Sequence, residues 1–420
     1  MDTTPAPVAG DELPFDVLLQ NVPGALQCVY QSFVDVDSGS VLAYEALLRG
    51  PAGTLWESPL ALLDAARTAG RLADLECASL RASLADAAWM TGGSPVTLFV
   101  NIEPRTLTRD LDVVLRELAA RPDHVQVVVE ITERALAEDL AGVLKSAEQL
   151  RSAGCGIALD DVGAEPASLA FIPLLRPEVI KLDLLLLRTI TDPAAITVAG
   201  AVRAYAEESG AEVVAEGVET SADLTRALVL GATLGQGWLW DRGVRQLRPT
   251  VFDPERFAAR PVVSFPHTTP YDLIGTARKA RRAPKKLLVP MTKTLEMMAL
   301  HARVPPVLLA GFQRAEFFRP SIARRYADLA AHLPYVGAFG TGMPTEPAPG
   351  VRGTALSTSD PLTDGWAIVI LGAHTSAALV ARDLGDIGPD DERSFEFVVT
   401  YDRNLVTMAA HAMVGRLSSS

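Results

Sequence analysis

The stretch GCGIALDDVGAEPASLAFIPLLRPEVIKLD, residues 154–183, holds two short apolar runs that both finish in charged residues. The run GIALDD ends in Asp160 and Asp161, and the run PEVIKLD brings Lys181 and Asp183. Short apolar runs of this length are typical of strands that are buried on both faces. A core strand gains nothing from an ionised end, so these charged ends predict a functional site where the strands finish.

The same alternation continues on both sides of this stretch, over about 220 residues in all. We predict a hairpin at 29–49 with its turn at 37–40, helices near 58–89, 110–120, 135–153, 194–209 and 221–230, and strands VTLFVN, VQVVVEI, GIALDD, PEVIKLD and AEVVAEG. Alternating strands and helices predict a parallel α/β sheet, either open or closed, and a count of about eight strands favours a barrel. In such barrels the chemistry lies at the carboxyl ends of the strands.

Composition limits the classes of protein that the chain can belong to. A length of 420 residues predicts two domains, a barrel and a smaller module. The formal net charge of −13 argues against a general nucleic-acid binder, so we expect no DNA partner. We expect a cytoplasmic protein without a membrane partner, because no apolar run approaches the roughly 20 residues of a span and no signal peptide is evident. The three cysteines, Cys28, Cys77 and Cys155, are too scattered for a disulfide framework and are expected to be buried.

Polar groups end nearly every predicted strand of the barrel, and most of them are carboxylates. The set is Glu45, Asn101, Glu130, Asp160 with Asp161, Lys181 with Asp183, Glu216, and Gln236. Crowded carboxylates repel one another unless cations lie between them. Oxygen ligands suit Mg²⁺ or Mn²⁺ better than zinc, which normally recruits His or Cys. The pattern therefore predicts a divalent-metal site at one rim of the barrel.

The motifs that hold these groups are YEALLRG, FVNIEP, EITE, DDVG, KLD, AEGVET and QGWLW, in that order. They resemble the EAL family of cyclic di-GMP phosphodiesterases over about residues 25–245. The resemblance implies an EAL-type (β/α)8 TIM-like barrel, a two-metal site of Mg²⁺ or Mn²⁺, and hydrolysis of cyclic di-GMP to linear pGpG. It also implies a homodimer.

The resemblance also implies a role for each motif residue. Ligands of one metal would be Glu45, Asn101, Glu130 and Asp160, with Asp161 and Asp183 at the second. Lys181 would lie near the attacking water, Glu216 would be the general base or its equivalent, and Leu47, Arg49 and Gln236 would contact the nucleotide. Glu133 would anchor the loop that follows the strand GIALDD.

Each residue taken alone has a plainer interpretation. Glu45 before a basic residue is typical of a surface ion pair, and Gln236 in GQGWLW can simply close a turn. Asp183 can cap the helix that follows it, and that role is compatible with metal binding. The ordered set, rather than any one member, favours the functional interpretation.

One motif departs from the family. Where the family has DDFGTGYSSL, this chain has DDVGAEPASL, so that Val162, Glu165 and Pro166 replace a phenylalanine, a glycine and an aromatic residue. Proline fixes φ and removes a donor, so we expect a different loop backbone here. The departure leaves two rivals to an active enzyme: an effector that binds cyclic di-GMP without turnover, and a barrel that serves only as a dimerisation scaffold.

Five prolines between positions 249 and 270 mark the end of the repeating pattern. We predict a tail at 1–24, the barrel at 25–250, a linker at 251–270 and a smaller α/β sensory domain at 271–420. The phrases FFRP, ARRYADLA and YVGAFG and the closing strand and helix resemble the DICT sensory domain, which implies regulation of the barrel through an unknown ligand or a protein partner. The basic stretch RKARRAPKK at Arg278–Lys286 is expected to be a solvated helix end, and Trp366 a core residue.

Overall fold

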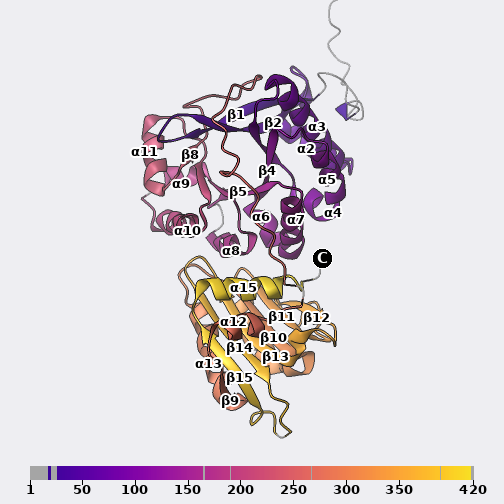
Figure 1. Ribbon diagram of the computed structural model, residues 1–420, viewed down its shortest axis with the longest axis vertical. Helices are drawn as coiled ribbons and strands as arrows, with labels where there is room; N and C mark the ends of the chain where they lie inside the picture. Colours follow the sequence, from indigo (N-terminus) through magenta and orange to yellow (C-terminus); the bar gives the residue numbers. More distant parts are fainter. Residues whose placement is uncertain are drawn as a thin grey trace, which may run out of the picture.

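The computed structural model describes residues 18–19, 26–163, 166–189, 191–265, 267–387 and 389–417. These residues form a closed eight-stranded barrel and a separate seven-stranded sheet, which lie one above the other (Figure 1). Most of the predicted tail at 1–24 lies outside the described residues. No helix among the described segments is long and apolar enough to cross a membrane.

The barrel closes in chain order, with each strand beside the next. Its strands are β1 (Gln27–Asp35), β2 (Val41–Arg49), β3 (Val96–Asn101), β4 (Val125–Thr132), β5 (Gly156–Val162), β6 (Val179–Leu182), β7 (Glu212–Ala215) and β8 (Leu234–Gly235). The predicted hairpin is confirmed, since β1 and β2 pair antiparallel. The first strand is thus antiparallel to both of its neighbours, β2 and β8, whereas the strands from β2 to β8 run parallel to one another.

Helices cover the outside of the barrel, and two of the predicted helices are divided. The helices are α2 (Pro59–Thr68), α3 (Leu72–Met90), α4 (Pro104–Arg109), α5 (Leu111–Ala119), α6 (Glu133–Glu138), α7 (Leu140–Ser152), α8 (Ile172–Leu175), α9 (Leu184–Arg188), α10 (Pro193–Ser209) and α11 (Ser221–Leu230), with 3₁₀ turns at Leu55–Glu57 and Pro166–Phe171. Gly70 separates α2 from α3 with a φ of 67°, a left-handed conformation that favours glycine. Asp139 separates α6 from α7 and caps α7 by accepting the Gly142 N–H at 2.9 Å.

The segment after the barrel is held against it. Phe257 is buried among Phe33, Phe99 and other inward side chains, and its ring meets that of Phe99 edge-on with centroids 5.4 Å apart. Arg256 pairs with Glu212 at 2.7 Å, and the Arg260 backbone N–H donates to a buried carboxylate. The predicted linker therefore seals the amino-terminal end of the barrel, where no strand end carries a site residue.

The C-terminal domain is a mixed sheet with helices on both faces (Figure 1). Its elements are α12 (Pro270–Ala277), β9 (Arg281–Pro284), α13 (Lys285–Leu300), β10 (Val307–Arg314), α14 (Pro320–Ala330), β11 (Val336–Thr341), β12 (Arg352–Leu356), β13 (Gly365–Leu371), β14 (Ser376–Asp383), β15 (Ser394–Thr400) and α15 (Arg403–Val414), with 3₁₀ turns at Ala315–Phe317 and Pro361–Asp364. The strand order is β12-β11-β10-β13-β14-β15-β9.

Alternation along β13 assigns the two faces of this sheet. Val369 packs in the cluster that contains α12 and α15, whereas Ile368 and Ile370 pack in the cluster under α13 and α14. The α15 face lies next to the barrel, where α15 contacts α8 (Figure 1). Arg403 at the start of α15 pairs with Glu208 of α10 at 3.1 Å, so α15 carries contacts between the two domains.

The basic stretch at Arg278–Lys286 is a helix end only in part: Arg278 follows the last residue of α12, and Lys285 begins α13. Between them lies the edge strand β9, which pairs with β15, and cations of the stretch meet carboxylates of the same domain. Arg278 lies 2.7 Å from Asp402, and Lys285 lies 2.7 Å from Asp390. Charged side chains on an edge strand protect it from pairing with other chains, which the sequence pattern alone did not indicate. The three cysteines are free and buried, as predicted.

Candidate active site

One buried ammonium lies at the centre of the predicted constellation. Lys181 is the next-to-last residue of β6 and is 1% exposed, and four carboxylates surround it, three from β2, β4 and β5 and one from the residue that follows β7. The distances from Nζ are 2.8 Å to Glu130, 2.8 Å to Glu216, 3.2 Å to Asp160 and 3.5 Å to Glu45. Residues that lie up to 171 positions apart in the chain thus converge at one rim of the barrel.

The register of the parallel strands produces this convergence. Asn101 of β3 is the direct partner of Glu130 of β4, and Thr132 of β4 pairs with Asp160 of β5. Parallel neighbours advance together, so their last residues reach the same edge of the sheet. The carboxyl ends of the strands therefore meet at one mouth, as the barrel fold requires.

Two side-chain amides fix the Glu45 carboxylate. Asn101 donates from Nδ2 to Glu45 Oε1 at 2.7 Å, and Gln236 donates from Nε2 to Glu45 Oε2 at 2.6 Å. The Gln236 amide also donates to Gln31 at 3.3 Å. Sequence reasoning missed Gln31 of β1, which the pairing register places directly opposite Glu45.

The charges at this rim do not balance. Burial raises the pKa of Glu130 well above its usual range, and the neighbouring Glu45 raises it further. Burial also raises the pKa of Glu216 to about 8, although Lys181 opposes the shift. Burial on its own would lower the pKa of Lys181, but Glu130 and Glu216 outweigh it and raise that pKa. Four carboxylates around one ammonium leave an excess of negative charge that protons or cations must relieve.

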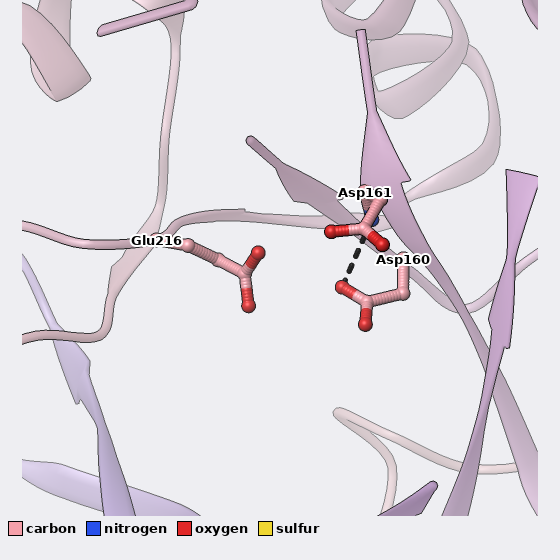
Figure 2. Close-up of side chains that lie close together, drawn as sticks. All are labelled: Asp160, Asp161 and Glu216. Atoms are coloured by element: carbon pink, nitrogen blue, oxygen red, sulfur yellow. Dashed lines mark hydrogen bonds between the residues drawn. The ribbon is translucent and has the colours of Figure 1, made fainter. Parts of the chain in front are cut away.

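Asp160, Asp161 and Glu216 form a second, more open group beside the first (Figure 2). One ligand oxygen from each lies within 4.8 Å of the others, and the Asp161 backbone N–H donates to Asp160 at 3.0 Å. Asp161 has a φ of 58°, a left-handed conformation that is strained for a side chain other than glycine. Such strain is found at functional sites, where it sets the direction of a side chain.

The two remaining acidic residues flank this group. Asp183 caps α9 by accepting a hydrogen bond from the Leu185 backbone N–H. The pKa of Asp161 is raised chiefly by burial, then by the charge of Asp160, and to a smaller extent by the charge of Asp183. Glu133 begins α6 and accepts hydrogen bonds from the Gly163 backbone N–H at 3.2 Å and from the Ser168 hydroxyl. Glu133 therefore holds both sides of the altered loop, of which residues 164 and 165 lie outside the described part of the chain.

A cleft of about 620 Å³ opens beside the carboxylates. Its lining includes Leu47, Arg49, Asn101 and Glu130, so both predicted substrate contacts of β2 face it. Leu47 and Arg49 share the strand face of Glu45, because alternate residues of a strand point to the same side. The volume lies within the range of about 300–1,000 Å³ that is typical of small-molecule sites.

The residues present fit divalent cations. The donors are carboxylate and amide oxygens, which hard cations prefer, and the described part of the site offers no histidine or cysteine. Glu130 Oε2 is buried and has no hydrogen-bond partner among the described residues. A buried carboxylate oxygen without a hydrogen-bond partner, next to excess negative charge, suits the role of a cation ligand.

Comparison with known proteins agrees with this geometry. The EAL domain model matches residues 19–242, and a model described as "Sensory domain in DIguanylate Cyclases and Two-component system" matches residues 273–384. Cyclic di-GMP phosphodiesterase RocR of Pseudomonas aeruginosa is 34% identical over 156 residues, which are 36% of this chain and 39% of RocR. The probable cyclic di-GMP phosphodiesterase PdeB of Escherichia coli is 28% identical over 224 residues, which are 52% of this chain and 42% of PdeB.

Among solved structures, the manganese and cyclic di-GMP complex of Klebsiella pneumoniae BlrP1 at pH 6 is 29% identical, with a TM-score of 0.46 over 54% of this chain and 57% of that one. The matched segments span about two fifths of the length of RocR and of PdeB. The EAL model alone covers more than half of the present sequence. The chain belongs to the EAL domain family.

Proposed function

We propose that this protein hydrolyses cyclic di-GMP to linear pGpG with Mg²⁺ or Mn²⁺. The observation that carries the proposal is the set of four carboxylates that converge on Lys181 at the mouth of the barrel. The similarity to RocR, which is named a cyclic di-GMP phosphodiesterase, and to PdeB, which is named a probable one, supports the same substrate. The cleft beside the carboxylates gives that substrate a place to bind.

The residues that would hold the cations divide into two groups. Glu45, Asn101, Glu130 and Asp160 would bind one cation, and Asp161 and Asp183 would help to bind the other. Divalent cations in such a site lower the pKa of water and offset negative charge on a phosphodiester. The excess of carboxylates over ammonium groups is the feature of this chain that requires them.

The other side chains act on the substrate and the proton. Glu216 would accept a proton from the attacking water, and Lys181, whose Nζ lies 2.8 Å from its carboxylate, would hold that carboxylate in position. Arg49 lines the cleft and would offset charge on the phosphate oxygens. Leu47 would contact the nucleotide, and Gln236 would contact it while also orienting Glu45.

Purified protein, cyclic di-GMP and either Mn²⁺ or Mg²⁺ test the proposal, with pGpG measured by chromatography. We expect pGpG to accumulate, and chelation of the metal to stop it. Glu216→Gln should reduce turnover by about a hundredfold or more while cyclic di-GMP still binds, because general-base catalysis contributes factors of about 10²–10⁴. The exposed Glu219, three residues along the same segment, gives the matched control Glu219→Gln, which should retain turnover.

A binding effector is the second candidate, and the altered loop DDVGAEPASL favours it. This loop follows directly from Asp160 and Asp161, so a change in its backbone bears on the second group of ligands. Tight binding of cyclic di-GMP without pGpG, in both Mn²⁺ and Mg²⁺, would establish the effector and contradict the enzyme.

We further propose a homodimer in the cytoplasm, because the proposed substrate is an intracellular second messenger, with the barrel regulated by the C-terminal domain. The contact between α15 and α8 supports regulation, since α8 follows the loop after β5. Turnover by the full chain and by a chain that ends at residue 264 should differ. Sedimentation should give twice the 44.7 kDa of one chain, and a single-chain mass would contradict the dimer.

A further inference from the structure

The C-terminal domain contains a cavity of its own, far smaller than the cleft of the barrel. It has a volume of about 80 Å³ and lies between α13, α14 and the sheet face that points away from the barrel. Five aromatic side chains contribute to its walls: Phe312, Phe317, Tyr326, Trp366 and Phe395. Trp366, predicted as a core residue, is half-buried and takes part in this wall.

The rings of this wall are arranged to accept another ring. Phe312 meets Tyr326 edge-on with centroids 5.4 Å apart, and Trp366 meets Phe395 edge-on at 6.1 Å. Edge-to-face packing leaves ring faces and edges available for further aromatic contacts. The volume is about half that of an apolar cavity known to hold benzene, so a bound ring would keep one edge toward solvent.

One polar group at the cavity lacks a well-aligned partner. The Tyr326 side chain is fully buried, and its hydroxyl lies near the Glu296 carboxylate without a well-aligned hydrogen bond to any described residue. Glu296 is 2% exposed and is engaged by Arg325 at 2.6 Å. A buried hydroxyl without a well-aligned partner is unfavourable, and a ligand that supplies a hydrogen bond would relieve it.

The backbone at the cavity is strained. Gln313 is buried with a φ of 60°, at the place where the pairing of β10 with β11 shifts register. This conformation brings Gln313 into the cavity lining, and its amide donates to Asp383 at 3.2 Å. A non-glycine residue in this region is typical of ligand sites rather than of ordinary strands.

The cations at the cavity are already neutralised. Phe317 lies under the Lys285 ammonium at 4.8 Å and the Arg393 guanidinium at 5.6 Å. Lys285 pairs with Asp390, and Arg393 pairs with Asp383 and Asp390. Because these charges are matched within the domain, the site has no unpaired cation among the residues that the structure describes, and so none to recruit an anionic ligand.

We propose that this cavity binds a neutral, single-ring aromatic molecule that carries one hydrogen-bonding group, a phenol being the simplest example. The ring lies against the aromatic wall, and its polar group hydrogen-bonds near Tyr326 and Glu296. The site is separate from the barrel cleft, so the proposal holds whether or not the barrel hydrolyses cyclic di-GMP.

The test uses 4-fluorophenol and the full chain, with ¹⁹F line broadening as the measure of binding. We expect saturable broadening that phenol reverses and that cyclic di-GMP leaves unchanged. Fluorobenzene, which lacks the hydroxyl, should bind about fivefold more weakly, and 4-fluorobenzoate, an anion, should bind more weakly still. Broadening that does not saturate, or that cyclic di-GMP reverses, would overturn the proposal.

Two variants separate this cavity from any other site. Tyr326→Phe keeps the ring and should weaken 4-fluorophenol about fivefold while leaving fluorobenzene unchanged. Tyr271→Phe is the matched control, because Tyr271 lies on the opposite face of the same sheet and bonds to Glu396 at 2.8 Å. Val289→Trp should fill the cavity and abolish binding of both probes. Equal effects of the two tyrosine variants, or full binding by Val289→Trp, would contradict the assignment.

Discussion

Lys181 is the residue on which the candidate active site depends most directly. Its ammonium is fully buried, and it is the only cation in contact with the four carboxylates among the described residues. Removing one partner of a buried ion pair leaves uncompensated charge and costs about 3–5 kcal/mol. A divalent cation at the same carboxylates would relieve that charge in the folded state only, and so would stabilise it.

Lys181→Met should therefore unfold at a lower temperature than the unaltered protein in the presence of a chelator. Mn²⁺ should restore much of the loss, so that the gain in melting temperature on adding Mn²⁺ is larger for the variant. Lys145→Met, at an exposed position of α7, serves as the control and should change neither value. Equal gains for Lys181→Met and the unaltered protein would show that the carboxylates do not form the metal site.

The residue scale also shows what the sequence could indicate. Charged residues at the ends of apolar runs, such as Glu130 in VQVVVEI, were enough to predict a shared rim, because parallel strands end together. The position of Lys181 at the centre of the carboxylates was not predictable, since it depends on barrel closure. Gln31 was missed because it lies in mid-strand, where only the pairing register reveals its neighbour Glu45.

Among the elements, the loop between β5 and the 3₁₀ turn at Pro166–Phe171 departs most from the family pattern. Its anchors nevertheless remain in place. Gly163 has a φ of 113° and lies against Leu186, where a Cβ atom would approach the leucine to 2.3 Å, so glycine is required there. Glu133 accepts from Gly163 and Ser168 on the two sides of the loop. The loop thus changes in its middle and keeps its ends.

Glu133→Ala should release both ends of this loop. Losing an acceptor shared by two donors costs about 1–3 kcal/mol of unfolding free energy. Turnover should fall by about tenfold or more, because Asp160 and Asp161 precede the loop and small displacements are costly in catalysis. Urea unfolding and pGpG formation measure the two effects. Glu138→Ala, at an exposed pair with Arg134 in the same helix, should cost no more than about 0.5 kcal/mol; a similar cost from both variants would argue against the anchor.

Elements with strong local signals were predictable, and those set by distant contacts were not. The helix at Ser221–Leu230 matches its prediction because Thr220 and Asp223 form a capping box that is visible in the sequence. The strand β9 was predicted as a helix end, because its pairing with β15 lies more than a hundred residues away. The chain after the barrel was predicted as a linker, since nothing local shows that Phe257 is buried against the barrel.

At the scale of the whole molecule, the contact between the domains is the feature that the sequence did not reveal. Helix α15 makes contacts on two sides: it packs on its own sheet and also contacts α8 of the barrel. His411 of α15 lies at this contact, near Pro173 of α8. Its Nε2 atom is covered from solvent and has no hydrogen-bond partner among the described residues.

This histidine makes the contact sensitive to acid. The pKa of His411 is lowered to about 4, chiefly by burial and to a smaller extent by Arg176 and Arg151, whereas a backbone hydrogen bond at Pro173 opposes the shift. The unfolded chain has a histidine pKa near 6.5. Between about pH 6.5 and 4 the unfolded state therefore binds a proton that the folded state does not. The stability that neutral His411 contributes is fully present above about pH 6.5 and is lost as the pH falls toward 4.

His411→Gln should remove this dependence. Between pH 7.5 and pH 5 the unaltered protein should lose up to about 2 kcal/mol more unfolding free energy than the variant, because one pKa unit corresponds to about 1.4 kcal/mol. Urea unfolding at the two pH values measures this difference. The carboxylates titrate in both proteins alike, so their contribution to the unfolding free energy cancels in the comparison. His332→Gln, at an exposed histidine that follows α14, should behave like the unaltered protein. If His411→Gln and His332→Gln lose the same stability on acidification, His411 is not buried in its neutral form, and the docking of α15 on α8 is looser than the structure describes.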